Sequence, residues 1–304
     1  MKKETKNIAA SVRARLQNKA KETNRPFAEL LQYYSMERFL YRLTKSEYAE
    51  RFILKGALMF TVWKVPQRRT TLDIDFLSKS NIDPVKLEKV IRQVCQVNVP
   101  DDGLFFNPNT VIGERIKENV DYKGVRIKFK GFLERAKIPM QIDFAFGDVI
   151  YPKPSLIQYP VILDLPEPHL MGYTCESVVA EKFEAMIKLG DSNSRMKDFY
   201  DVWLLARKFD FEGTNLSDAI RKTFKRRKTG LPEKLPLFSE DIYDQKSDRQ
   251  TLWKAFLKKT QNQKAPETLN EIALFIEDFL AEPIIAIHTD QNFTFKWKAP
   301  GPWK

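Results

Sequence analysis

The chain has 304 residues, of which 51 are Lys or Arg and 40 are Asp or Glu, giving a formal net charge of +11. A hydrophobic content of 43% with 30% charged residues is typical of a folded globular protein and excludes a disordered chain. Two cysteines exclude a disulfide framework, and two histidines leave little room for a histidine-rich zinc site. We therefore expect chemistry based on carboxylates and lysines.

Hydropathy and charge lead to two further expectations. The longest apolar stretch, residues 52–63, is interrupted by Lys55 and is too short to span a bilayer. No segment has the pattern of a signal peptide, so we expect a cytoplasmic protein without a membrane partner. The positive excess either attracts a polyanion such as nucleic acid or simply solubilises the surface, and charge by itself leaves both interpretations open.

The predicted elements change in character about halfway along the chain. Hydrophobic periodicity predicts helices over 4–22, 27–43, 56–63 and 84–95, and strands over 71–77, 110–118, 122–133 and 138–146. After a proline-rich stretch at 152–168, the pattern predicts helices over 175–189, 195–209, 215–228, 249–260 and 266–282. We expect an α+β fold with a mixed sheet in a first domain over 1–165. A mainly helical second domain over 166–304 is expected to carry a loosely held tail from about residue 288.

Two aspartates on one predicted strand are the most informative feature. Residues two apart on a strand point to the same face, roughly 6.6 Å apart along the chain, so Asp73 and Asp75 project together. Leu72, Ile74 and Phe76 are then expected to pack behind the sheet. Two neighbouring carboxylates suit Mg²⁺ or Mn²⁺, and a pair of such ions about 3.5–4 Å apart clamps the oxygens of a phosphoryl transfer. The alternative is a solvated strand face.

A second strand repeats this pattern. Met140, Ile142 and Phe144 face one way in residues 138–146, and Asp143 faces the other. A third carboxylate beside Asp73 and Asp75 completes the donor set of a two-metal site. The repetition makes a solvated face the weaker interpretation.

A glycine upstream of these strands predicts a phosphate-binding turn. Gly56 lies between the short apolar run 52–54 and a predicted helix, and free backbone N–H groups at a helix start bind phosphate. Lys55 adds positive charge. Arg69 either binds phosphate or faces solvent.

Charged residues interrupt two predicted apolar helix faces. Lys182 lies on the stripe of Val178 and Leu189, and Asp198 lies on the stripe of Val202 in the next helix. The two residues either form a buried salt bridge between the helices or face a cleft. In a cleft, Lys182 would contact a triphosphate, and Asp198 would act as a base or position a nucleophile.

The third helix of this predicted domain ends in a basic run. A cluster of this density either binds the phosphates of RNA or is a solvated helix end. The candidate RNA-binding residues are Arg221, Lys222, Lys225, Arg226, Arg227 and Lys228.

Together these segments resemble the nucleotidyltransferase-type AbiEii/AbiGii toxins of bacterial type IV toxin–antitoxin systems. The resemblance covers roughly residues 50–210, and its order and spacing are more specific than any single motif. At Ala57 the chain departs from the family, which usually has a second Gly or a Ser there, so a hydroxyl contact to phosphate is in doubt. The matching segments are LKGALMF at 54–60, TLDIDF at 71–76, QIDFAFGD at 141–148, ESVVAEKFEAMI at 176–187 and SRMKDFYDVWLL at 194–205.

The resemblance implies a nucleotidyltransferase-like first domain and metal-dependent transfer of a nucleoside monophosphate from an NTP. For relatives, the acceptor is the tRNA 3′ end, and its modification blocks aminoacylation and translation in phage defence. A small-molecule or protein acceptor, or a nucleic-acid-binding protein with an inactive site, is the alternative. A cognate antitoxin is the implied partner, and we expect a monomer.

The resemblance also implies a role for each matching residue. Asp73, Asp75 and Asp143 would hold Mg²⁺ or Mn²⁺. The catalytic set would comprise Asp73 and Asp75 together with Lys182 on the nucleotide phosphates and Asp198 near the acceptor hydroxyl. The remaining nucleotide- or phosphate-binding residues would be Lys55, Gly56, Ala57, Arg69, Arg195 and Lys197.

Overall fold

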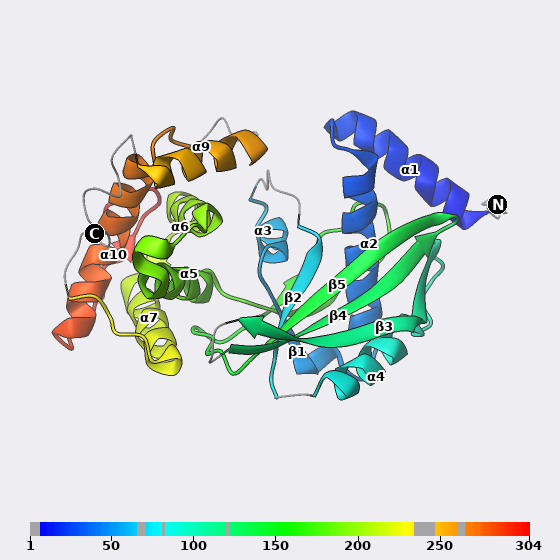
Figure 1. Ribbon diagram of the computed structural model, residues 1–304, viewed down its shortest axis with the longest axis horizontal. Helices are drawn as coiled ribbons and strands as arrows, with labels where there is room; N and C mark the ends of the chain where they lie inside the picture. The colour runs from blue at the N-terminus through cyan, green and yellow to red at the C-terminus, as the bar shows by residue number, and fades with distance from the viewer. Residues whose placement is uncertain (1–6, 66–70, 81–82, 119–121, 234–246, 261–264) are drawn as a thin grey trace. The chain divides into compact units, whose positions relative to one another are not determined.

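The computed structural model describes residues 7–65, 71–80, 83–118, 122–233, 247–260 and 265–304 (Figure 1). The chain divides into two compact units. The first unit comprises Met1–Gly147 and Ser155–Gly172, and the second comprises Asp148–Pro154 and Tyr173–Lys304. Residues 165 and 166, where the boundary between domains was expected, both lie in the first unit, and the proline-rich stretch at 152–168 contributes to both units.

A seven-stranded mixed sheet forms the first unit, which confirms the predicted α+β fold. The strand order is β3-β4-β5-β2-β1-β7-β6, with β2 and β5 parallel and β3, β4 and β5 antiparallel. The sheet comprises β1 (Phe52–Lys55), β2 (Asp73–Ser78), β3 (Leu104–Glu118), β4 (Tyr122–Leu133), β5 (Ala136–Phe146), β6 (Ser155–Gln158) and β7 (His169–Gly172).

Helices of the first unit bury one face of this sheet. They are α1 (Ile8–Thr23), α2 (Phe27–Thr44), α3 (Leu58–Val62) and α4 (Pro84–Cys95). Helix α2 passes on one side of the sheet (Figure 1), where Phe39 packs against Phe106 and Phe129. Asp83 caps α4 and Pro84 opens it, because proline lacks the N–H that would be unsatisfied at that position.

The second unit is mainly helical, as the sequence predicts. Its helices are α5 (Cys175–Leu189), α6 (Met196–Lys208), α7 (Gly213–Arg227), α9 (Asp248–Thr260) and α10 (Leu269–His288). Thr174 caps α5 through a hydrogen bond from the Ser177 N–H, and Gly190 ends the helix with φ +46°. The next helix begins after Arg195 with no side-chain cap.

The prediction of a loosely held tail is wrong. The short strands β8 (Phe211–Glu212) and β9 (Lys296–Trp297) pair, and Trp297 and Trp303 are buried. The indole N–H of Trp303 donates to the Phe279 carbonyl in α10, and its ring stacks on Phe279 with centroids 5.8 Å apart. Burial of two indoles offsets the conformational entropy that ordering the tail costs.

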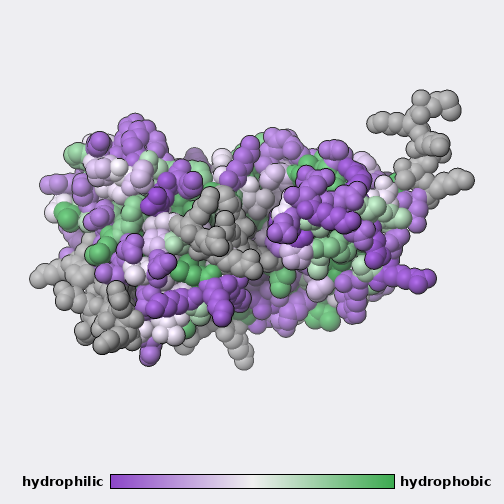
Figure 2. All heavy atoms as spheres, turned by 90° about the horizontal axis from the view of Figure 1, so that it is seen from above, coloured by the Kyte–Doolittle hydropathy of each residue, from purple (hydrophilic) through white to green (hydrophobic). Residues whose placement is uncertain are grey.

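The face of the molecule seen in Figure 2 is mostly polar. In the view from above in Figure 2, hydrophilic residues cover most of the coloured surface and hydrophobic residues occur in small groups. Among the described helices, none is long and apolar enough to cross a membrane.

Candidate active site

Three aspartates meet on adjacent strands of the first unit. On β2, Asp73 and Asp75 alternate with Ile74, which is fully buried, as predicted. The parallel register between β2 and β5 places Asp75 beside Asp143. One carboxylate oxygen from each aspartate lies within 4.8 Å of the others. We call Asp73, Asp75 and Asp143 the acidic triad.

The donor set of the acidic triad fits a hard divalent cation. Carboxylate oxygens are the ligands that Mg²⁺ and Mn²⁺ prefer, and all three side chains are only partly buried. Three negative charges this close repel one another, and a cation among them removes that repulsion. The metal role of each aspartate stays a prediction.

The prediction for Leu72 is wrong. Strand β2 begins at Asp73, and the Leu72 side chain is 64% exposed instead of packing behind the sheet. The neighbouring Thr71 is buried, and its hydroxyl donates to Oδ1 of Asp73. Alternation was expected to bury Leu72. Instead, Leu72 precedes the strand, and the buried residue before it, Thr71, orients Asp73.

Arg126 on β4 is the residue that sequence reasoning missed. It stands opposite Asp143 in the antiparallel register and donates from Nε and Nη2 to the two carboxylate oxygens, at 2.8 and 2.7 Å. These bonds to Asp143, with the added charge of Asp73, raise the pKa of the guanidinium further. The available signal was an outward-facing arginine on a predicted strand beside that of Asp143.

Gly56 is required by the acidic triad for a steric reason. Its φ is +71°, in the left-handed region, and a Cβ built on it would lie 1.9 Å from Oδ2 of Asp75. Lys55 precedes it at the end of β1, directly opposite Asp75, and Ala57 is buried. Helix α3 follows at once. Binding of phosphate by this turn stays a prediction, and Arg69 lies outside the described residues.

In the second unit, Lys182 holds two aspartates between α5 and α6. Its Nζ lies 2.7 Å from Oδ1 of Asp198 and 2.8 Å from Oδ2 of Asp201. Asp198 is fully buried and also pairs with Arg195, whose Nε lies 2.7 Å from Oδ2. Of the two open interpretations, the described contacts show the salt bridge. Lys197 is exposed next to this cluster.

Both members of the Lys182–Asp198 pair are held in their charged forms. Burial opposes charge on the lysine, but the carboxylates of Asp198 and Asp201 overcome it and raise the pKa of Lys182. Burial likewise opposes charge on Asp198, and Lys182 with Arg195 lowers its pKa nonetheless. A buried carboxylate with a lowered pKa is a poor proton acceptor, whereas the ammonium keeps its charge and is 17% exposed.

The basic run on α7 divides into two kinds of residue. Lys225, Arg226 and Lys228 are exposed, as RNA-binding residues would need to be. Arg221 pairs with Asp290 at 3.6 Å. Lys222 pairs with Asp218 at 3.0 Å and lies over the Tyr151 ring at 3.4 Å from its centroid.

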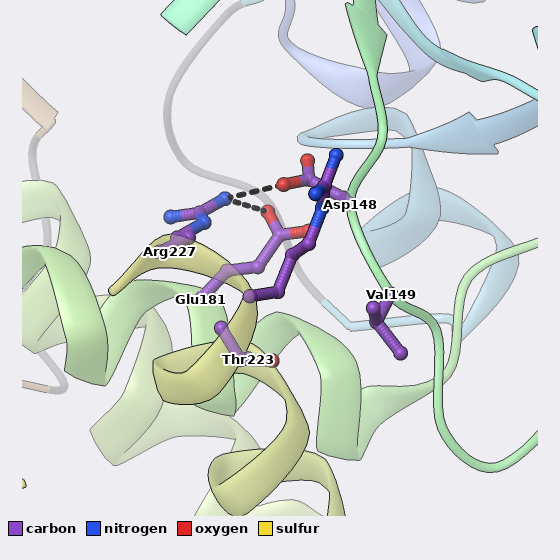
Figure 3. Close-up of a pocket in the computed structure, with 6 residues that line it drawn as sticks. Asp148, Val149, Glu181, Thr223 and Arg227 are labelled. Atoms are coloured by element: carbon purple, nitrogen blue, oxygen red, sulfur yellow. Dashed lines mark hydrogen bonds and ion pairs between the residues drawn. The ribbon is translucent and has the colours of Figure 1, made fainter. Parts of the chain in front are cut away.

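Arg227 has a different environment. Figure 3 shows it pointing toward Asp148 and Glu181 in a pocket that Thr223 also lines, with N–O distances of 3.1 and 3.4 Å. A third carboxylate, Glu184, lies 2.8 Å from it, and the side chain is 18% exposed. Internal ion pairs therefore occupy the guanidinium that the sequence suggested for RNA.

The fold and the acidic triad define an α+β protein with a candidate divalent-cation site on its sheet. The family model described as the nucleotidyl transferase AbiEii toxin of a type IV toxin–antitoxin system matches residues 38–288. The chain belongs to this family. Both strands of the acidic triad lie within the matched residues.

Two solved structures resemble the chain as well. One is a crystal structure from H. pylori described as a nucleotidyltransferase, with 13% identity, a TM-score of 0.48, and coverage of 86% of this chain and 97% of that one. The other is JHP933 from Helicobacter pylori, with 14% identity, a TM-score of 0.44 and the same coverage. At these values neither carries information about activity. No curated protein matches the chain.

Proposed function

We propose that the protein transfers a nucleoside monophosphate from an NTP to an RNA acceptor, the tRNA 3′ end foremost, and thereby blocks aminoacylation. The observation that carries this proposal is the convergence of Asp73, Asp75 and Asp143 in a chain of the AbiEii family. A cytoplasmic monomer controlled by a cognate antitoxin completes the proposal. Co-purification of the toxin with the product of the adjacent gene tests the partner.

The acidic triad would hold Mg²⁺ or Mn²⁺. When bound, such an ion neutralises charge that develops on the transferred phosphoryl group. The acceptor oxygen bonds to the α-phosphorus and its proton passes to a triad carboxylate. The bond to the bridging oxygen breaks and pyrophosphate leaves. Thr71 fixes the orientation of Asp73, so this carboxylate needs little rearrangement during the reaction.

In the second unit, the charge state of Asp198 distinguishes between its two possible roles, as a general base or as a positioning residue. Its burial and lowered pKa favour a positioning role over that of a general base. We propose that Asp198 and Asp201 hold the Lys182 ammonium in place and that Lys182 binds the nucleotide phosphates. Arg195 and Lys197 add positive charge at the start of α6, beside Asp198.

Nucleotide transfer tests the proposal directly. Purified protein is incubated with Mg²⁺, each labelled NTP in turn and total RNA, and a tRNA-sized band should carry the label. The isosteric variant Asp75→Asn should abolish labelling while the circular dichroism spectrum is unchanged. Absence of label with all four nucleotides, from folded wild-type protein, would contradict the proposal. Label on protein or in the small-molecule fraction would instead establish another acceptor.

A further inference from the structure

The sheet face that carries the acidic triad continues across β4 and β3 as an ordered surface. Side chains alternate, so residues facing the helices on β4, such as Ile127 and Phe129, are buried. The registers place the other residues in rows across the strands. One row holds Asp75, Asp143, Arg126 and Glu114; the next holds Asp73, Gln141, Lys128 and Ile112; a third holds Pro139, Lys130 and Asn107; the last holds Lys137, Phe132 and Phe105.

The far end of this surface presents aromatic rings to solvent. Phe105 and Phe132 are cross-strand partners whose ring centroids lie 6.2 Å apart, and Phe105 is 58% exposed. Their neighbours Leu104 and Leu133 point to the opposite face and are buried. Two adjacent rings offer flat apolar faces to solvent, and a paired platform of this kind is suited to stacking by another ring.

Charge changes sign along the same surface. Near the acidic triad, Arg126 is paired with Asp143, and Lys128 pairs with Glu114 at 2.5 Å. Toward the rings, Lys130 on β4 and Lys137 on β5 are exposed. From Asp143 to Lys137 the strand runs about 20 Å, at a rise of roughly 3.3 Å per residue. The surface therefore has an acidic end and a basic, aromatic end.

We propose that this face of β3, β4 and β5 binds the single-stranded 3′ segment of the RNA acceptor. Unpaired bases stack on Phe105 and Phe132, and the phosphates lie against Lys130 and Lys137. A path along the strands from the rings then leads the 3′ end of the RNA toward the acidic triad. This inference rests on the proposed function, since it assigns the acceptor's path to the same site. Base pairs in a duplex do not expose the faces that the rings need, so duplex RNA binds more weakly.

Stacking is tested with a 5′-fluorescein-labelled single-stranded oligoribonucleotide and the full chain, by fluorescence anisotropy without NTP. Phe105→Ala combined with Phe132→Ala should weaken binding roughly tenfold or more and leave its salt dependence unchanged. The matched control is Leu156→Ala, which removes a 69% exposed apolar side chain from β6 and should bind as wild type.

The charge contribution is tested by salt titration. Lys130→Gln combined with Lys137→Gln should make the negative slope of log affinity against log salt concentration shallower by about 1.4. Lys86→Gln combined with Lys89→Gln makes the same charge change at exposed positions on α4 and should match wild type. In transfer assays both face variants should raise the KM for RNA and leave binding of the Mn²⁺–NTP complex unchanged.

Wild-type RNA affinity in both face variants would overturn the inference, and so would equal binding of the duplex form. The inference would also be overturned if polyglutamate displaced the RNA and bound in a way that depended on Lys130 and Lys137 but not on Phe105 and Phe132. An acidic protein would then be the partner. The proposed function is tested separately. If the face variants transfer nucleotide with an unchanged KM for RNA, the binding face is wrong and the proposed activity stands. If the wild-type protein transfers no nucleotide but the face variants lose RNA binding, the proposed activity is wrong and the binding face stands.

Discussion

Oδ2 of Asp75 occupies the space in which a side chain on Gly56 would begin, since a Cβ there would lie 1.9 Å away. Gly56→Ala must therefore displace a triad carboxylate. A displacement of about 1 Å at a reacting centre costs on the order of 100-fold in rate, and we expect a loss of at least this size in nucleotide transfer.

A second glycine allows the effect of backbone strain to be distinguished from the effect of displacing Asp75. Gly190 also has a positive φ, +46°, but has open space where a Cβ would lie. Gly190→Ala should cost about 1 kcal/mol of stability and keep full activity. Equal activity of the two alanine variants would show that the site accommodates a Cβ at position 56 without a harmful displacement of Asp75.

Arg126 competes with a cation for Asp143. In Arg126→Gln the two charged hydrogen bonds to Asp143 are lost, and both oxygens of that carboxylate become available to a cation. We expect Mn²⁺ alone to bind about tenfold more tightly to this variant, by calorimetry, because a charged hydrogen bond is worth about 1.5–3 kcal/mol. Arg115→Gln, which removes a 67% exposed arginine from β3, is the control. Unchanged or weaker Mn²⁺ binding in Arg126→Gln would mean that Arg126 does not compete at the cation site.

The acidic triad and Arg126 differ in how far the sequence predicts them. Alternation with Ile74 and Ile142 sets the face of Asp73, Asp75 and Asp143, and the sequence therefore predicts all three. Arg126 is one of several basic residues on β4, and only the register with β5 shows that it faces Asp143. Register depends on long-range pairing, which one sequence does not encode in a local pattern.

The end of the chain shows a similar limit. The predicted helix stops at 282, before Pro283, but α10 continues through it to His288. The tail after α10 contains prolines and polar residues, which locally indicate disorder. Its two tryptophans find their partners on α6 and α10, where Trp297 donates to the Ala206 carbonyl. Tertiary packing overrides the local pattern here.

That packing predicts a large effect of Trp303→Ala. The ring is buried, and removing a buried tryptophan costs about 3–5 kcal/mol of unfolding free energy. Urea denaturation followed by circular dichroism measures the change. Leu274→Ala, which truncates a 50% exposed side chain on α10, should stay within about 0.5 kcal/mol of wild type. A loss below 1 kcal/mol in Trp303→Ala would restore the interpretation of a loose tail.

Lys182→Met leaves two buried carboxylates without their ammonium. Breaking a buried pair on one side costs about 3–5 kcal/mol, so the variant should lose stability of that order in urea denaturation. Adding Asp198→Asn should recover part of the loss, because the second buried charge is then removed. The control Lys188→Met changes an exposed lysine on the same helix. If Lys182 serves only as a salt bridge, the doubly substituted protein should also recover NTP affinity; a nucleotide-binding lysine predicts that it does not.

Glu37 on α2 makes the stability of the first unit depend on pH. It is fully buried, its Oε2 accepts from the Ile162 N–H at 2.8 Å, and its Oε1 lies 3.3 Å from Arg38. Burial raises its pKa to about 7, against the pull of Ile162 and Arg38. Between the unfolded pKa near 4.5 and about 7 the folded state binds more protons, so the free energy of unfolding falls as pH rises through this window and levels above it.

Glu37→Gln tests this dependence because the amide keeps an acceptor for Ile162 and cannot ionise. Wild type should lose up to about 3 kcal/mol between pH 4.5 and 7.5 through this group, and the variant should lack that component. Urea denaturation of both proteins across this range measures the difference, with the exposed Glu22→Gln as control. Parallel stability curves for wild type and Glu37→Gln would show that Glu37 is ionised throughout, with Arg38 supplying the compensating charge.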